Sequence, residues 1–166
     1  AFALPALIKV VDAICKKTGV TIANEKLQGM VFGSYNKKVE HPKTAFDWLT
    51  RDAKIVDAYI AHPLCGFTAS CGLLRDMMQG IYYNQQLKNL LNMRKDLPVF
   101  FIAGGDDPVG SYGKGVEQAA RHFRKAGMIN VALKLYPDCR HEILNERNRE
   151  TVYQDMLRWI ETHIEG

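Results

Sequence analysis

The stretch Pro98-Val-Phe-Phe-Ile-Ala-Gly-Gly-Asp-Asp107-Pro108-Val109 decides the fold of this chain. Its first part, residues 99–103, is apolar at every position, a pattern typical of a strand that lies between two helix layers of a parallel sheet. The glycines that follow predict a tight turn directly after this strand. We therefore expect an acidic side chain at the carboxyl end of a buried strand, where open α/β sheets place their chemistry.

A second strand and turn follow further along the chain. Residues 131–136 form the second predicted strand, and the loop after it carries His141. Between the strands, residues 112–126 have the apolar spacing of an amphipathic helix, and Gly127 marks its end. A strand–helix–strand unit of this kind forms a right-handed parallel crossover. Asp107 and His141 are then expected to lie at one edge of the sheet, within side-chain reach of each other.

The remaining sequence predicts helices rather than further strands. Three of them are expected over residues 5–17, 53–60 and 147–163. Asp52 and Thr50 are the two candidates for the N-cap of the middle one. Residues 69–93 form the longest helical region, with a break near Gly80, whereas residues 24–43 are polar and are expected to be mostly loop with one helical turn.

Two parallel strands do not make a stable sheet on their own. We therefore expect an α/β fold in which residues 96–166 are the C-terminal part of the core, residues 1–95 are a helical cap, and the N-terminal half of the sheet is missing. The chain begins with Ala1 rather than Met and has no charged region of a signal peptide, which indicates the middle of a longer protein. The missing half of that protein, or a second copy in a homo-oligomer, is the expected partner of the open strand edge.

Composition and charge disfavour several classes of function. The 166 residues are 47% hydrophobic and 24% charged, and a net charge of +4 is spread over both signs, so neither disorder nor nucleic-acid binding is expected. No apolar run reaches the ~18 residues that span a bilayer. The cysteines form no C-x-x-C pair, which disfavours a disulfide scaffold or a zinc knuckle and predicts free thiols in a cytoplasmic protein. They are Cys15, Cys65, Cys71 and Cys139.

Two stretches partly match motifs that bind a metal or a nucleotide. His141-Glu-Ile-Leu-Asn145 has asparagine in place of the second histidine of the H-E-x-x-H zinc motif. Gly110-Ser-Tyr-Gly-Lys-Gly115 has proline where a phosphate loop needs glycine, five residues before its Gly-Lys pair. We therefore expect no metal and no cofactor.

Three segments carry a resemblance to a known family. Residues 104–110, GGDDPVG, match the pattern G-x-x-D-x-V, and residues 135–142, LYPDCRHE, match y-x-x-x-x-H. Residues 49–64 match s-R-d-x-x-x-v-d-x-y-x-x-D-P-L more loosely, with His62 in place of its Asp. In this order the segments resemble the C-terminal half of an α/β-hydrolase, and most closely the lysophospholipase and monoacylglycerol-lipase-like branch, also called serine aminopeptidase-like hydrolases. The resemblance covers essentially the whole chain.

This resemblance implies that Asp107 and His141 are the acid and the base of a Ser-His-Asp triad. The neighbouring Asp106 is the alternative acid. The family carries its nucleophile in G-x-S-x-G, and no serine of this chain has glycine on both sides. The serines are Ser34, Ser70 and Ser111. We therefore expect the nucleophile to lie outside this chain, and this chain alone to be inactive.

The function implied is hydrolysis of a small or lipid-like carboxylic ester through an acyl-enzyme. Two alternatives stay open: another α/β-hydrolase chemistry, on peptides, haloalkanes or epoxides, and a non-catalytic member that acts only as a folded module. The apolar region of residues 67–93 is expected to cover the active site and to receive the acyl group. Its predicted substrate contacts are Met77, Met78, Ile81 and Tyr82.

Overall fold

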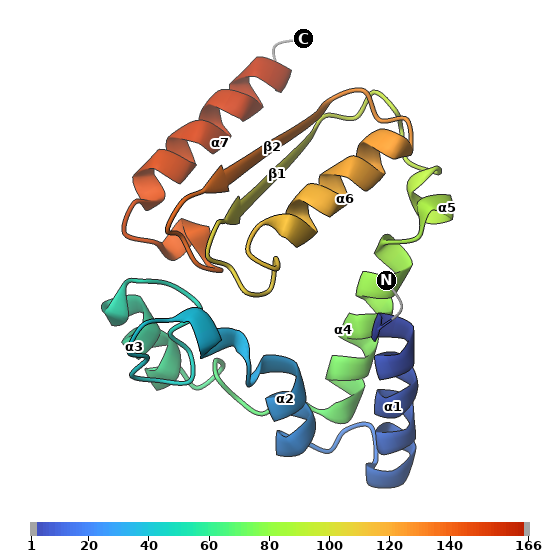
Figure 1. The fold of residues 1–166 in the computed structure, drawn as a ribbon, viewed down its shortest axis with the longest axis vertical. Helices are drawn as coiled ribbons and strands as arrows, with labels where there is room; N and C mark the ends of the chain where they lie inside the picture. The colour runs from blue at the N-terminus through green and yellow to red at the C-terminus, as the bar shows by residue number, and fades with distance from the viewer. Residues whose placement is uncertain (1–2, 165–166) are drawn as a thin grey trace.

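The computed structural model describes residues 3–164, which form an α/β arrangement with a helical N-terminal part (Figure 1). In chain order the elements are α1 (Ala3–Thr18), α2 (Glu25–Phe32), the 3-10 helix η1 (Tyr35–Lys38), α3 (Ala53–Ala61), α4 (Cys71–Asn84), α5 (Leu87–Leu90), β1 (Val99–Gly104), α6 (Lys114–Lys125), β2 (Val131–Tyr136), the 3-10 helix η2 (Ile143–Asn145) and α7 (Arg149–Ile164).

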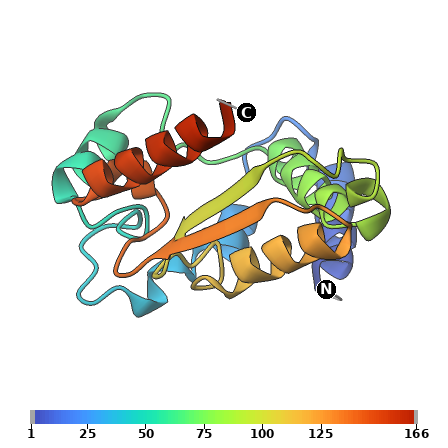
Figure 2. The same cartoon turned by 90° about the horizontal axis from the view of Figure 1, so that it is seen from above.

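The sheet has the predicted parallel pair of strands, and each of its faces carries one helix. Strands β1 and β2 pair along their full length, with α6 and α7 on opposite sides (Figures 1 and 2). Phe101 packs edge-on against Phe123 of α6, with ring centroids 4.9 Å apart. Phe100 stacks on Trp159 of α7 at 5.4 Å. The apolar character of β1 on both faces is thus explained by burial between two helix layers.

Within the described residues, each strand of the sheet is paired on one edge only. Among residues 3–164 it contains β1 and β2 alone, so each strand has one paired edge and one free edge. The two strands are flanked by helices and preceded by a helical region, as expected for the C-terminal part of an α/β-hydrolase. None of the described helices combines the length and the apolar character needed to cross a bilayer.

The N-terminal helical part has a core of its own. Helices α1 and α4 lie side by side (Figure 1), and the buried cluster between them includes Val11, Leu27, Cys71 and Leu74. A second cluster beside the sheet consists of Tyr136, Cys139, Ile143 and Val152. The first cluster holds the helical part together, and the second holds the loop after β2 against α7.

Residues 24–43 contain more helix than the single turn expected there, because both α2 and η1 lie in this stretch, so the expectation of mostly loop is wrong. The side chain of Asn24 caps α2 by accepting a hydrogen bond from the amide of Leu27 at 2.9 Å. Leu27 is itself buried in the cluster between α1 and α4. A short helix such as α2 is marginal by propensity alone, so packing of Leu27, Val31 and Phe32 against this cluster decides that it forms.

Two predicted helix bounds also change. The helical region of residues 69–93 breaks at Gln85, after α4, and Gly80 lies within α4. Helix α6 starts later than expected, since Ser111, Tyr112 and Gly113 have φ angles of 52°, 56° and 82°. Such angles do not fit a right-handed helix, so these residues form a turn that brings α6 back onto the sheet.

Candidate active site

The loops after β1 and β2 are joined by backbone hydrogen bonds. The amide of Gly105 donates to the carbonyl of Tyr136 at 2.8 Å, and the amide of Asp106 donates to that of Cys139 at 2.9 Å. A Cβ at Gly104 would lie 2.1 Å from the carbonyl oxygens of Cys139 and Arg140. Glycine at position 104 is therefore what lets the two loops approach closely.

Asp107 and His141 meet across these loops. Nδ1 of His141 lies 3.1 Å from Oδ1 of Asp107, and the same oxygen accepts from the amide of Val109 at 2.8 Å. The side chain of Asp107 is 8% exposed and that of His141 is 38% exposed. Asp106 is exposed and contacts the neighbouring loop through its backbone instead. The two side chains therefore meet at one edge of the sheet as expected, and the carboxylate that contacts His141 is that of Asp107, not Asp106.

This geometry fixes the roles of the two imidazole nitrogens. A carboxylate only accepts hydrogen bonds, so the contact with Asp107 is a hydrogen bond when Nδ1 carries the proton. In the neutral ring, Nε2 then has the free lone pair. Among residues 3–164, Asp107 is the side chain that hydrogen-bonds the His141 ring, which leaves Nε2 available to take a proton from a nucleophile.

Residues of the helical part contact both the backbone and the ring of His141. The amide of His141 donates to the carbonyl of Trp48 at 3.4 Å, and the amide of Glu142 donates to that of Leu49 at 2.7 Å. The rings of Trp48 and His141 lie 5.3 Å apart. Tyr35 packs edge-on against Trp48 at 4.9 Å, and burial, followed by the charge of Asp107, raises the pKa of Tyr35.

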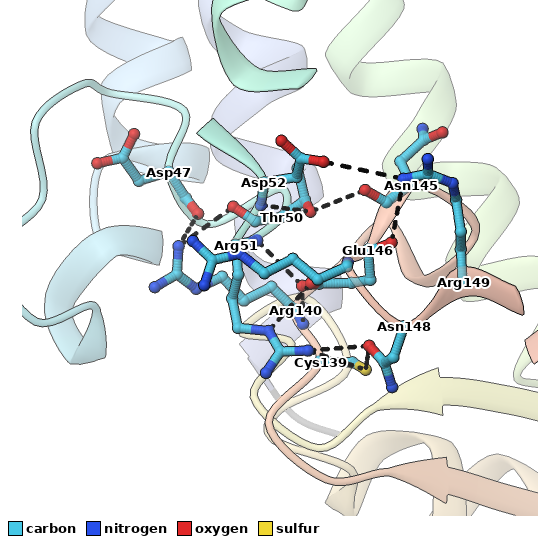
Figure 3. Close-up of polar contacts among 11 residues, drawn as sticks. Asp47, Thr50, Arg51, Asp52, Cys139, Arg140, Asn145, Glu146, Asn148 and Arg149 are labelled. Atoms are coloured by element: carbon cyan, nitrogen blue, oxygen red, sulfur yellow. Dashed lines mark hydrogen bonds and ion pairs between the residues drawn. The ribbon is translucent and has the colours of Figure 1, made fainter. Parts of the chain in front are cut away.

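A buried carboxylate anchors the loop after β2. Glu146 has no exposed side-chain surface and pairs with Arg51, whose Nε donates to it at 3.0 Å. Burial alone would lower the pKa of Arg51, but the hydrogen bond and charge of Glu146 outweigh it and raise that pKa. Figure 3 shows this group of side chains between the segment of residues 47–52 and the loop of residues 139–149.

An apolar cavity lies in the helical part of the chain, lined by residues between Gln28 and Met77. It has a volume of about 450 Å³, which is within the usual size range of small-molecule sites. Trp48 lines it and also contacts the His141 ring. Its other large apolar lining side chains are Phe32, Phe46, Tyr59, Phe67, Leu73, Leu74 and Met77. Trp48 thus connects this apolar cavity to the His141 ring.

The four residues predicted to contact substrate lie in three different surroundings. Met77 lines the apolar cavity. Met78 is 3% exposed and belongs to the core between α1 and α4. Ile81 and Tyr82 are exposed on α4 and are not among the lining residues of the cavity. Trp48, which was not singled out from the sequence, also lines the cavity, and its place directly before the s-R-d-like segment is the signal that could have indicated it.

The serines of this chain have other surroundings. The hydroxyl of Ser70 caps α4 by accepting from the amide of Leu73 at 3.2 Å. Ser34 precedes η1, and Ser111 lies in the left-handed turn before α6. Within residues 3–164, none of them hydrogen-bonds His141, no group of three metal-ligating side chains occurs, and all the cysteines are free.

Comparisons with known proteins show the family and the fold of this chain. The family model described as serine aminopeptidase, S33, matches residues 4–148. A thermostable carboxyl esterase from Bacillus coagulans, solved with glycerol, is 26% identical with a TM-score of 0.86, over 96% of this chain and 52% of its own. A lipase in its open form is also 26% identical, with a TM-score of 0.71, over 90% of this chain and 48% of its own.

A third structure is similar in fold. A soluble variant of monoglyceride lipase from Saccharomyces cerevisiae, in complex with a substrate analogue, is 24% identical with a TM-score of 0.60. That match covers 87% of this chain and 53% of the lipase. A search of curated proteins gave no match. The chain thus spans about half the length of the solved structures that it matches. With the family model covering most of its residues, this chain belongs to the serine aminopeptidase, S33, family of α/β-hydrolases.

Proposed function

We propose that the protein hydrolyses carboxylic esters through an acyl-enzyme, with Asp107 as the acid and His141 as the base of a catalytic triad. The contact of 3.1 Å between Nδ1 and Oδ1, with Nε2 left available, is the observation that carries this proposal. The nucleophilic serine and the oxyanion hole come from a part of the protein outside this chain. The esterase and lipase named above support an ester as the substrate class.

The pair acts as base and then as acid. Nε2 of His141 takes the proton of the serine hydroxyl as its oxygen attacks the ester carbonyl, and then gives that proton to the leaving alcohol. Water attacks the acyl-enzyme in the same way and releases the acid. The carboxylate of Asp107 holds the ring in the tautomer that Nε2 needs and stabilises the imidazolium that forms. Because Asp107 is buried, solvent screens this interaction only from the side of the partly exposed His141 ring.

The apolar cavity supports a substrate with an apolar acyl group. Trp48 lines the cavity and its ring lies 5.3 Å from that of His141, so an acyl chain that extends past Trp48 would bring its carbonyl close to the base. We propose that residues 1–95 act as the cap that forms this acyl site, and that the substrate is a lysophospholipid-like or monoacylglycerol-like ester. The free cysteines fit a reducing compartment, and we propose the cytoplasm.

The test uses the full-length protein, meaning this chain together with the part that carries the nucleophile. A fluorophosphonate probe should label one serine outside this chain, and His141→Ala should abolish both labelling and hydrolysis of p-nitrophenyl butyrate. A series of monoacylglycerols of increasing chain length, with a peptide amide, a haloalkane and an epoxide beside it, reports the substrate class. Hydrolysis that survives His141→Ala, or labelling of Ser34, Ser70 or Ser111, would refute the proposal.

A further inference from the structure

The backbone amides of three consecutive residues, His141 and its two neighbours, hold His141 in place. Each of them donates a hydrogen bond to a residue that is distant in the loop or in another segment. The amide of Arg140 donates to Oε1 of Glu146 at 2.9 Å. The amides of His141 and Glu142 donate to the carbonyls of Trp48 and Leu49. The position of the His141 backbone is therefore set by Glu146 and by the segment around Trp48, not by the strand β2 alone.

The carboxylate of Glu146 uses its full capacity as an acceptor. Oε1 accepts from the amides of Arg51 and Arg140, at 3.1 and 2.9 Å. Oε2 accepts from Nε of Arg51 at 3.0 Å and from the amide of Arg147 at 3.2 Å. A carboxylate has about four lone-pair sites, and here four donors occupy them in a fully buried position. One side chain thus ties residue 51 to both sides of the loop that carries His141.

Two arginines extend the connection between the segments. Nη1 of Arg140 donates to the carbonyls of Asp47 and Thr50, at 2.6 and 3.2 Å. Nη2 of Arg51 donates to Oδ1 of Asn148 at 2.9 Å. Figure 3 shows Glu146 in the middle of these contacts. The arginine fork of residue 51 spans the loop on both sides of Glu146, a geometry that a lysine cannot reproduce.

We propose that Glu146 is a positioning residue that sets the place of His141 relative to Asp107 and to the nucleophile, acting with Arg51. This inference rests on the proposed function. Asp107 comes from the loop after β1 and His141 from the loop after β2, so their contact depends on how the two loops sit against each other. Hydrogen bonds of Gly105 and Asp106 fix the start of the second loop, and Glu146 fixes its middle.

The inference goes beyond a contribution to stability. A displacement of about 1 Å at a catalytic group can lower the rate by about 100-fold. In Glu146→Gln an amide NH₂ replaces one oxygen, so in either orientation two of the four donors face another donor. The loop must shift to relieve this, and His141 shifts with it. We expect kcat for p-nitrophenyl butyrate to fall by about 10- to 100-fold, with KM within about twofold of wild type.

The experiment compares four variants of the full-length protein. Glu146→Gln and Arg51→Lys disturb the positioning group, and His141→Ala is the reference for loss of the base. Asp155→Asn is the matched control, because Asp155 on α7 is also a buried carboxylate with several donors, including Tyr136 Oη at 2.9 Å. It makes no hydrogen bond or ion pair with residues 138–142. Each variant is measured for kcat, KM and thermal midpoint at a temperature where it is fully folded.

Each outcome decides something. A fall of kcat in Glu146→Gln and in Arg51→Lys, with normal kcat in Asp155→Asn at an equal or larger loss of thermal midpoint, supports the inference. Normal kcat in folded Glu146→Gln overturns it, as does a fall that Asp155→Asn shares in proportion to its instability. If Glu146→Gln does not fold, Arg51→Lys decides by the same criteria. Full activity of His141→Ala would overturn the proposed function itself.

Discussion

Replacing Asp107 by asparagine is the most direct test of the candidate triad, and Asp106→Asn is its natural control. The two residues are neighbours in the same turn, but only Asp107 is buried and contacts His141. The substitution keeps the size of the side chain and removes its charge. It therefore probes the electrostatic role of Asp107 with little change in packing.

The size of the effect follows from the contact distance. Two unit charges 3.1 Å apart attract each other by about 5 kcal/mol at an effective dielectric constant of about 20. Each 1.36 kcal/mol corresponds to about tenfold in rate, so full loss of this attraction to the imidazolium would cost about 10⁴-fold. Because His141 is 38% exposed, solvent screens part of it, and we expect kcat of Asp107→Asn to fall by about 10³-fold.

The assay is steady-state hydrolysis of p-nitrophenyl butyrate by the full-length protein, with thermal midpoints measured in parallel. Asp106→Asn should keep kcat within about twofold of wild type, since surface changes away from the pair have small effects. Loss of activity in Asp106→Asn with an active Asp107→Asn would show that the structure assigns the wrong carboxylate. Equal, small effects of both would remove the triad from the account.

Three further predictions concern stability, measured by urea unfolding. Leu74→Ala, in the buried core, should lower the unfolding free energy by about 3 kcal/mol, whereas the exposed Leu73→Ala should change it by less than about 0.5 kcal/mol. Gly104→Ala should destabilise the protein, because its Cβ would meet two carbonyl oxygens. Gly80→Ala, on an open helix surface, should stabilise it by about 0.5–1 kcal/mol. Equal effects of the two substitutions would contradict the close approach of the loops after β1 and β2. Burial alone would raise the pKa of Asp47, but hydrogen bonds from neighbouring groups lower it overall. The contribution of Asp47 to the unfolding free energy should therefore be complete above the ordinary carboxyl pKa of about 4 and should disappear as the pH falls through the lowered pKa. A difference in unfolding free energy between wild type and Asp47→Asn that does not shrink at all as the pH is lowered would contradict this.

The sequence predicted the elements whose local pattern is decisive. The apolar run of β1, the amphipathic spacing of the helix between the strands and the turn glycines each predict the local backbone conformation of a few residues. The structure has a strand, a helix and turns at these places. Since parallel strands end at the same edge of a sheet, the pairing of Asp107 with His141 followed from the same patterns. Local chemistry was enough here because short-range sterics and solvent exposure dominate these segments.

Only the tertiary structure decided which long-range contacts complete the site. Periodicity places Met77 and Met78 on α4, but the position of α1 decides that Met78 is buried in the core and Met77 faces the cavity. Glu146 and Arg51 are 95 residues apart in the sequence, and nothing in either local segment predicts their pairing. Burying a carboxylate is favourable only when several donors converge on it, and that convergence exists only once residues 47–52 and the loop after β2 have folded against each other.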